Sequence, residues 1–200
     1  KYIAGEGITP TLRQGQIRCG RFKDKAKLLC ARSPHITMGN LYRVENNLND
    51  GIWDYFNLGD NIVCVNAIGE NVQQRLNGCD YDSDTMLITD EELLVNAAER
   101  YKDLFKVPVC NIKAEGQTKQ TLSALDHDTS VNKIGEIVNL SQKLNSILWD
   151  ELYKGADERR VHAIYEDICK LAVLSGLEID KAKRAFENIR VSKELVAIRK

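Results

Sequence analysis

A change in the spacing of apolar residues near Thr89 constrains the fold of this chain more than any other feature. Before this point, short apolar runs alternate with glycine-containing turns, a pattern typical of strands in a compact barrel or sandwich. After it, apolar residues recur at the three- and four-residue spacing of helices. The sequence therefore predicts an α+β protein, with a β-barrel over residues 1–89 and a helical subdomain over residues 90–200 that packs on the barrel.

The individual elements follow from the same spacing. Five strands are expected at residues 16–19, 26–31, 41–45, 62–68 and 86–88. The Thr89-Asp90-Glu91-Glu92 run matches a capping box and predicts a helix through about Phe105. Pro108 cannot donate to a ladder, so residues 107–110 are expected as a short edge strand and the polar residues 113–129 as a loop. Further helices are expected at residues 130–155, 157–176, 180–189 and 192–200.

Composition places the chain in a broad class only. Its 200 residues are 43% hydrophobic and 28% charged, with a net charge of −1, as in ordinary globular proteins. The six cysteines form no C-x-x-C pair and several lie in apolar runs, which predicts buried, reduced thiols. The sequence has no signal-peptide pattern and no apolar run near 18 residues, so a cytoplasmic protein without a membrane partner is expected. Because the sequence begins at Lys1, without methionine, we also expect an excised part of a longer chain.

Positive charge is concentrated between Thr11 and Val44. This segment holds eight basic residues and one acidic residue, Asp24. Such an excess could face a polyanion or a triphosphate, or it could be a set of exposed side chains that discourage strand pairing. No aromatic residues interleave with the bases as a base-stacking surface would require. Both interpretations remain open at this point.

Three aspartates near the end of the strand-rich part carry the strongest chemical signal. Asp80, Asp82 and Asp84 alternate with other residues, so on an extended chain their carboxylates project from one side. At roughly 5 Å and an effective dielectric near 20, each pair repels by about 3 kcal/mol. The cluster must take up protons, extend into water or hold a cation. Apolar residues 86–88 follow at once, which favours a divalent-metal site over a free, solvated loop.

Three interpretations of the triad compete. In the first, the three aspartates and Glu91 occupy positions 1, 3, 5 and 12 of an EF-hand calcium loop, although Thr85 stands where the sharp turn needs glycine. In the second, the run is a structural or incidental acidic turn. In the third, it is a catalytic magnesium site for phosphoryl or nucleotidyl transfer, because magnesium bridges carboxylates and substrate phosphates.

Other segments stand in a definite order around the aspartates. Upstream lies Cys30-Ala31-Arg32-Ser33-Pro34-His35, with Gly39 close behind. Downstream lie Ile134-Gly135-Glu136-Ile137-Val138-Asn139, Ile168-Cys169-Lys170-Leu171-Ala172 and Ile179-Asp180-Lys181-Ala182-Lys183. With Asn77 to Ile88, these segments resemble the two-barrel RNA polymerases. That family comprises the largest subunit of multisubunit enzymes, the RNA-dependent polymerases of eukaryotic silencing and single-chain phage enzymes.

The resemblance spans roughly residues 15–185 and implies roles for single residues. It pairs Asn77 to Ile88 with the family's D-x-D-G-D metal loop, so Asp80, Asp82 and Asp84 would chelate a catalytic Mg²⁺, or Mn²⁺ in its place. Arg32 would match the family arginine near the sugar of the incoming nucleotide. The downstream segments resemble a G-x-I-x-N helix and a following helix of the silencing and phage-type branches.

Two positions depart from the family pattern. Ser83 replaces the glycine between the second and third aspartates, so the turn must form without a positive φ or under strain. The asparagine that multisubunit enzymes carry two residues before the first aspartate falls on Gly78. Asn77, one position further back, is the candidate for sugar contact. The spacing is closer to the silencing and phage-type branches.

The resemblance implies a double-psi β-barrel that carries the metal loop, followed by a helical subdomain. It implies magnesium-dependent nucleotidyl transfer to an RNA 3′ end on a DNA or RNA template, with NTPs, template and RNA product as partners. The family also needs a second barrel that supplies a lysine, so a chain of this length is expected to be inactive by itself. His35, His127 and His162 lack ligand spacing, and none is expected to act as a base. The alternative from another class is a non-catalytic calcium-binding or protein-interaction module with an EF-hand-like loop.

Overall fold

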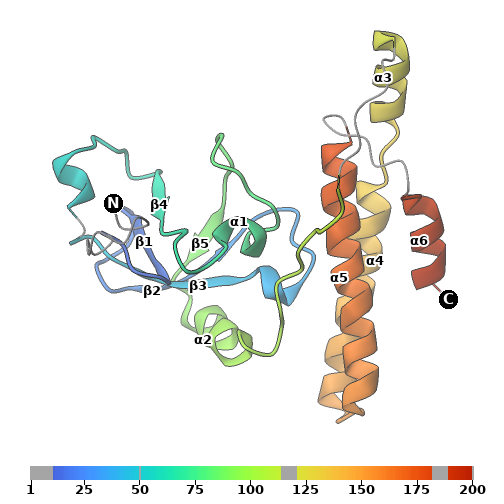
Figure 1. Cartoon of the computed structure of the whole chain (residues 1–200). Helices are drawn as coiled ribbons and strands as arrows, with labels where there is room; N and C mark the ends of the chain where they lie inside the picture. The colour runs from blue at the N-terminus through green and yellow to red at the C-terminus, as the bar shows by residue number, and fades with distance from the viewer. Residues whose placement is uncertain (1–10, 50, 114–120, 182–188, 200) are drawn as a thin grey trace. The chain divides into compact units, whose positions relative to one another are not determined.

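The chain forms two compact units. The computed structural model describes residues 11–49, 51–113, 121–181 and 189–199 (Figure 1). The sheet unit comprises the described residues up to Ser33 together with Met38–Lys106, and the helical unit comprises Pro34–Thr37 with the described residues from Val107 onward. The division after Lys106, rather than near residue 89, arises because helix α2 (Glu92–Tyr101) packs on the sheet through Val95 and Ala98.

The sheet unit is built on a curled, five-stranded half-barrel (Figure 1). Its strands are β1 (Gln16–Cys19), β2 (Lys27–Ala31), β3 (Tyr42–Asn46), β4 (Val63–Val65) and β5 (Leu87–Thr89). Their order is β4-β1-β3-β2-β5, so β4 and β5 are the edges of the described sheet. The β1·β3 pair is parallel and the other pairs are antiparallel. All five predicted strands are confirmed, and the α+β class with them.

One face of the sheet carries the core. Side chains of β3 alternate, and Tyr42, Val44 and Asn46 are buried. Tyr42 and Val44 belong to a hydrophobic cluster whose other buried members are Ile17, Cys19, Leu28, Cys30, Val72, Leu76 and Cys79. All six cysteines are free thiols, and Cys19, Cys30 and Cys79 are buried as predicted, whereas Cys110 is exposed. Burial raises the pKa of the Cys30 thiol to about 12, so it remains protonated at neutral pH.

Helix α2 begins later and ends earlier than the capping pattern predicts. Thr89 is the last residue of β5, where it pairs with Leu29, so it cannot serve as the N-cap. Its hydroxyl instead accepts a hydrogen bond from the Glu91 N–H at 3.1 Å, and α2 starts at Glu92. The helix ends at Tyr101 rather than near Phe105. Strand pairing therefore outweighs the local capping preference.

The helical unit contains α3 (Leu122–Ser130), α4 (Ile134–Tyr153), α5 (Glu158–Asp180) and α6 (Val191–Ile198). Helices α4 and α5 form an antiparallel pair (Figure 1), joined by a turn at Gly155, whose φ is +69°. Their buried apolar contacts include Ile137, Leu148, Ile168 and Leu171. The Glu178 carboxylate near the end of α5 accepts the Lys133 N–H at 3.0 Å, which satisfies a donor at the start of α4.

Several expected elements of this unit are wrong. Helix α3 lies largely within residues 113–129, which were expected to be a loop. Residues 114–120 of that segment are outside the described residues. Residues 107–110 have no strand. Helix α5 continues through Gly176 to Asp180, because the flanking Ser175 and Leu177 are buried and hold the helix in place. Most of the helix expected at residues 180–189 falls outside the described residues. Among the helices that the structure does describe, none has the length and apolar character needed to cross a membrane.

Candidate metal centre

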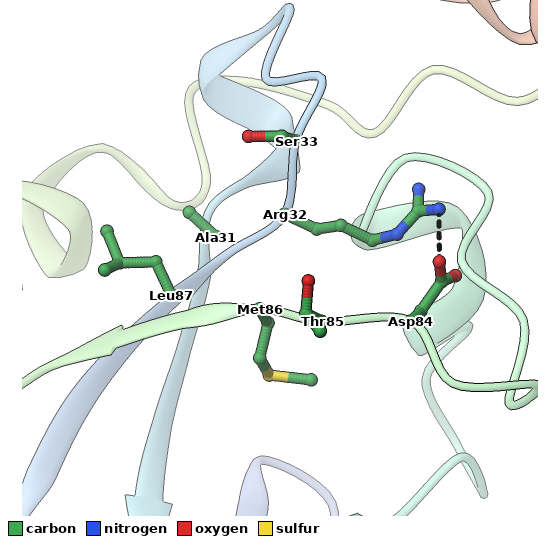
Figure 2. A pocket seen from close by; sticks show the side chains of 7 residues that line it. All are labelled: Ala31, Arg32, Ser33, Asp84, Thr85, Met86 and Leu87. Carbon is green, nitrogen blue, oxygen red and sulfur yellow. Dashed lines mark hydrogen bonds and ion pairs between the residues drawn. The ribbon is translucent and has the colours of Figure 1, made fainter.

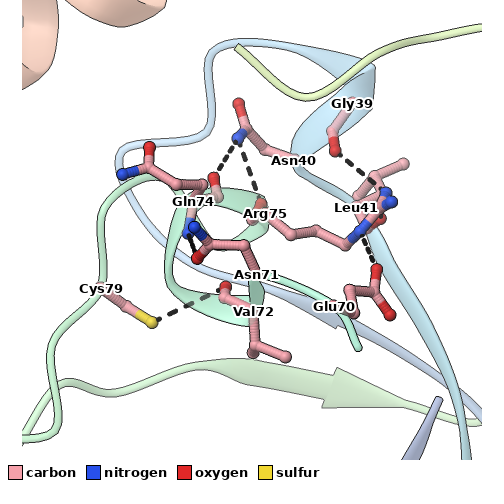
Figure 3. A network of polar contacts seen from close by, with 9 residues as sticks. All are labelled: Gly39, Asn40, Leu41, Glu70, Asn71, Val72, Gln74, Arg75 and Cys79. Carbon is pink, nitrogen blue, oxygen red and sulfur yellow. Dashed lines mark hydrogen bonds and ion pairs between the residues drawn. The ribbon is translucent and has the colours of Figure 1, made fainter. Parts of the chain in front are cut away.

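The aspartate loop is held at its base by a polar network. Helix α1 (Val72–Arg75) precedes the loop, and the Asn71 side chain caps it by accepting the Gln74 N–H at 3.1 Å. The Asn40 amide donates to the carbonyl of Arg75 at 3.1 Å, and the Arg75 guanidinium lies 2.5 Å from Glu70 (Figure 3). The Asn40 contact joins two segments that lie 35 residues apart in the sequence. Together, these contacts fix the point from which the loop departs.

The chain reverses direction directly after α1. Asn77 and Gly78 both have positive φ values, +56° and +72°. Left-handed residues are common at helix ends, where glycine and asparagine are the preferred types. The reversal sends the three aspartates back toward β5.

The three aspartates come together as predicted. One carboxylate oxygen from each of Asp80, Asp82 and Asp84 can be chosen so that all lie within 4.8 Å of one another, and all three residues are exposed. Two oxygens bound to one magnesium lie at most about 4.2 Å apart, because each bond is about 2.1 Å long. Small rotations of these exposed side chains are enough to bring the carboxylate oxygens from within 4.8 Å to within about 4.2 Å of one another. A set of carboxylates alone suits a hard cation such as Mg²⁺ or Mn²⁺.

Arg32 lies against Asp84, the last aspartate of the triad (Figure 2). Its guanidinium donates to Asp84 Oδ1 at 2.7 Å and to the main-chain carbonyl of Asn77 at 3.2 Å. The other oxygen of Asp84 accepts the Asp80 N–H at 2.9 Å. Asp84 is therefore oriented from two sides. Both predicted substrate-binding residues, Arg32 and Asn77, are at the loop, although the atom of Asn77 that meets Arg32 belongs to the main chain.

A shallow cavity of about 360 Å³ adjoins the loop (Figure 2). It is lined by Ala31, Arg32, Ser33, Asp84, Thr85, Met86 and Leu87. Pairing of Ala31 with Leu87 places β2 beside β5, and Arg32 directly after β2 reaches Asp84, which lies shortly before β5. The volume falls at the lower end of small-molecule sites, and one guanidinium and one carboxylate form its charged wall. It could hold the phosphate or sugar portion of a nucleotide.

Cys79, next to the first aspartate, is a poor metal ligand. Burial raises the pKa of its thiol, and the Asp84 and Asp80 carboxylates add to this effect, while Arg32 opposes it. A protonated thiol does not coordinate a metal ion. The candidate donor set is therefore the three carboxylates.

Ser83 has a φ of +112°, a backbone conformation that residues with a side chain rarely adopt. The sequence left two possibilities for this position, a turn without a positive φ or a strained turn, and the structure has the second. Strain of this kind costs about 1–3 kcal/mol.

Replacing Ser83 with glycine is expected to raise the free energy of unfolding of the sheet unit by about 1 kcal/mol, because glycine adopts this φ without steric conflict. Urea denaturation followed by fluorescence measures the change. Ser83→Ala is the matched control, since it removes the hydroxyl but keeps the Cβ and should give no gain. Equal stabilities of the glycine and alanine variants would contradict the strain.

Sequence reasoning missed Asn40 and Arg75, which anchor the base of the loop. Their contacts span 35 and 36 residues, and neither residue belongs to a local motif. Comparison with protein-family models, curated proteins and solved structures finds no match for this chain.

Proposed function

We propose that this chain is the metal-binding barrel of a two-barrel RNA polymerase and that its chemistry is magnesium-dependent nucleotidyl transfer. The observation that carries the proposal is the convergence of Asp80, Asp82 and Asp84 beside Arg32. The positive φ at Ser83 supports it, because the family pattern has glycine at this position and glycine adopts such a φ most readily.

The architecture is consistent with this proposal. We propose that the half-barrel belongs to a double-psi β-barrel, in which further strands would close the gap between β4 and β5. A mixed sheet with a parallel β1·β3 pair at its centre is compatible with such a barrel. The segment that resembles the family's G-x-I-x-N helix forms the first turns of α4, with Ile137 buried.

Each residue has a role in this proposal. The three aspartates would hold Mg²⁺ or Mn²⁺. When bound, such an ion would lower the pKa of the RNA 3′-hydroxyl and would neutralise negative charge on the departing pyrophosphate. Arg32 would orient Asp84 and bind a phosphate or sugar oxygen in the adjoining cavity, where a guanidinium can donate to two oxygens at once. Asn77 would position Arg32 through its carbonyl.

The partners in this proposal are NTPs, a nucleic-acid template, the RNA product and a second barrel. The second barrel would supply the family lysine from another part of a longer chain or from another chain. We therefore expect the 200-residue chain to bind the metal weakly and to extend no primer. Primer extension by the chain alone would contradict the need for a second barrel.

Isothermal titration with Mn²⁺, and then with Mg²⁺, tests the metal site. Asp82→Ala is expected to weaken binding at least tenfold, since it removes one of the three charged ligands. Asp103→Ala is the matched control, because it removes an exposed carboxylate of the same unit outside the triad. An unchanged titration after Asp82→Ala would refute the proposed site.

The alternative, an EF-hand-like calcium module, lacks a supporting observation among the described residues. Glu91 would have to supply the twelfth ligand, but it lies beyond β5 at the start of α2 and outside the carboxylate group. The preceding helix α1 has only four residues. Circular dichroism with and without calcium distinguishes the two, since the EF-hand module predicts a clear calcium response and the barrel predicts little.

A further inference from the structure

An ion pair joins the aspartate loop to the end of β2. Arg32 follows β2 directly, and its guanidinium nitrogen Nη2 lies 2.7 Å from Asp84 Oδ1. Counting side-chain atoms alone, Arg32 is 17% exposed and Asp84 is 25% exposed. Water and salt screen a pair with this little exposure less than they screen a pair on the open surface. The guanidinium is therefore a strong electrostatic partner for one carboxylate of the triad.

Both oxygens of Asp84 accept a hydrogen bond. Oδ1 accepts from Arg32, and Oδ2 accepts from the Asp80 N–H at 2.9 Å. The Asp80 N–H belongs to the main chain, so it moves only if the loop itself rearranges. The guanidinium stands at the end of a long side chain and can leave by rotation about side-chain bonds. Of the two donors, Arg32 is therefore the one that a competing cation can displace.

The positive charge of Arg32 opposes a second cation at the same carboxylate. Asp84 is one of the three proposed metal ligands, and it is the one that the guanidinium contacts. A divalent cation held there would be repelled by the guanidinium, and this repulsion is larger at a partly shielded site than in bulk water. The same cation would attract the carboxylate with twice the charge of the guanidinium. Metal coordination by Asp84 and its ion pair with Arg32 are therefore in competition.

Arg32 has another place available when it leaves Asp84. It lines the cavity of about 360 Å³ beside the loop, together with the hydroxyl-bearing Ser33 and Thr85 (Figure 2). Its other printed contact, from Nη1 to the Asn77 carbonyl at 3.2 Å, involves no carboxylate and keeps the side chain near the loop. Release from Asp84 would therefore leave the guanidinium beside the cavity.

We propose that Arg32 is a built-in counter-cation of the aspartate triad. It pairs with Asp84 when no metal is bound, lowers the affinity of the site for a divalent cation, and is displaced from Asp84 when the metal binds. The inference rests on the metal site proposed above and adds a regulation of that site. Arg32 is thus a positioning residue that acts through Asp84, and metal binding makes its guanidinium available to the cavity.

Isothermal titration with Mn²⁺ measures the competition. Arg32→Gln removes the charge but keeps a side-chain N–H donor, and we expect it to bind Mn²⁺ about tenfold more tightly than the unaltered chain does. Arg32→Lys restores the charge, so its affinity should return to within about twofold of the unaltered chain's. Arg21→Gln is the matched control, because it removes an exposed arginine of the same unit that contacts the neutral Asn61 side chain. It should change the affinity less than about twofold.

NMR of the ¹⁵N-labelled, unaltered chain tests the displacement itself. The hydrogen bonds to Asp84 and Asn77 restrict rotation of the guanidinium, so Arg32 should give separate Nη resonances before metal is added. These resonances are identified by their absence from the spectrum of Arg32→Lys. They should merge into the averaged signal of a rotating guanidinium as Mg²⁺ saturates the site. A guanidinium that only orients Asp84 would keep them separate.

The possible results separate this inference from the metal site on which it rests. If Asp82→Ala weakens Mn²⁺ binding but Arg32→Gln binds Mn²⁺ no more tightly than the unaltered chain, the metal site stands and the competition is overturned. If the Arg32 resonances remain separate after Mg²⁺ has saturated the site, the displacement is overturned. If neither the unaltered chain nor Arg32→Gln binds Mn²⁺, the metal site and this inference both fail.

Discussion

Replacing Asn46 with alanine is expected to lower the free energy of unfolding of the sheet unit by about 3–4 kcal/mol. Asn46 is the last residue of β3, and its side chain is fully buried. Its amide nitrogen contacts the carbonyls of Cys19, Phe22 and Lys23 at 2.9 to 3.1 Å, and its oxygen accepts the Cys19 N–H at 2.9 Å. Alanine would remove all of these hydrogen bonds. The Cys19 and Lys23 carbonyls would keep the Phe22 and Ala26 N–H groups as partners, so the cost, about 1–3 kcal/mol for each buried group left unpaired, falls mainly on the Phe22 carbonyl and the Cys19 N–H.

Asn46→Asp tests the same network, because the aspartate side chain has almost the same shape as the asparagine side chain. A carboxylate has no N–H to donate and would face three carbonyl oxygens, so it should destabilise at least as much as alanine. Asn49→Ala is the control, because this exposed residue makes one amide contact, to Asp24, and should cost below about 1 kcal/mol. Urea denaturation is followed through Trp53 in a Trp149→Phe background, since each unit contains one of the two tryptophans. A loss below about 1 kcal/mol for Asn46→Ala would contradict the role given to this network.

The second large effect is expected in the helical unit. Leu171→Ala removes a fully buried side chain from the α4·α5 contact and should lower the free energy of unfolding by about 3 kcal/mol, from lost apolar burial plus a cavity. The transition is followed through Trp149 in a Trp53→Phe background. Leu122→Ala is the matched control, because this α3 side chain is 83% exposed and should change stability little. Equal effects of the two leucine substitutions would contradict the packing described for α5.

The strands were predictable because each is a short apolar run between turn residues, and β1 matches its expected range, residues 16–19. The ends of the helices were not predictable from the sequence, because tertiary contacts decide where each helix begins and ends. Thr89 offers a capping hydroxyl but is taken into β5 by pairing with Leu29. Gly176 suggests a helix end, yet burial of Ser175 and Leu177 on either side keeps α5 continuous. Local propensity is a weak guide where packing opposes it.

The part of the candidate site that is formed by residues close together in the sequence could be predicted. The aspartates lie within five residues of one another, so their alternation was enough to predict that they meet. The position of Arg32 followed from family resemblance, whereas its contact with Asp84 spans 52 residues and depends on the β2·β5 register.

The short segment Pro34–Thr37 has a consequence for the order of events during synthesis. It belongs to the helical unit although the sheet unit surrounds it in sequence. Ile36 is buried, and its carbonyl accepts the Asn145 amide at 2.9 Å, a contact between residues 109 positions apart. On the ribosome, Ile36 therefore emerges long before the helix that covers it. At typical elongation rates of about 5–20 residues per second, roughly 5–20 seconds separate the synthesis of Ile36 from that of Asn145, so their contact forms only after that interval.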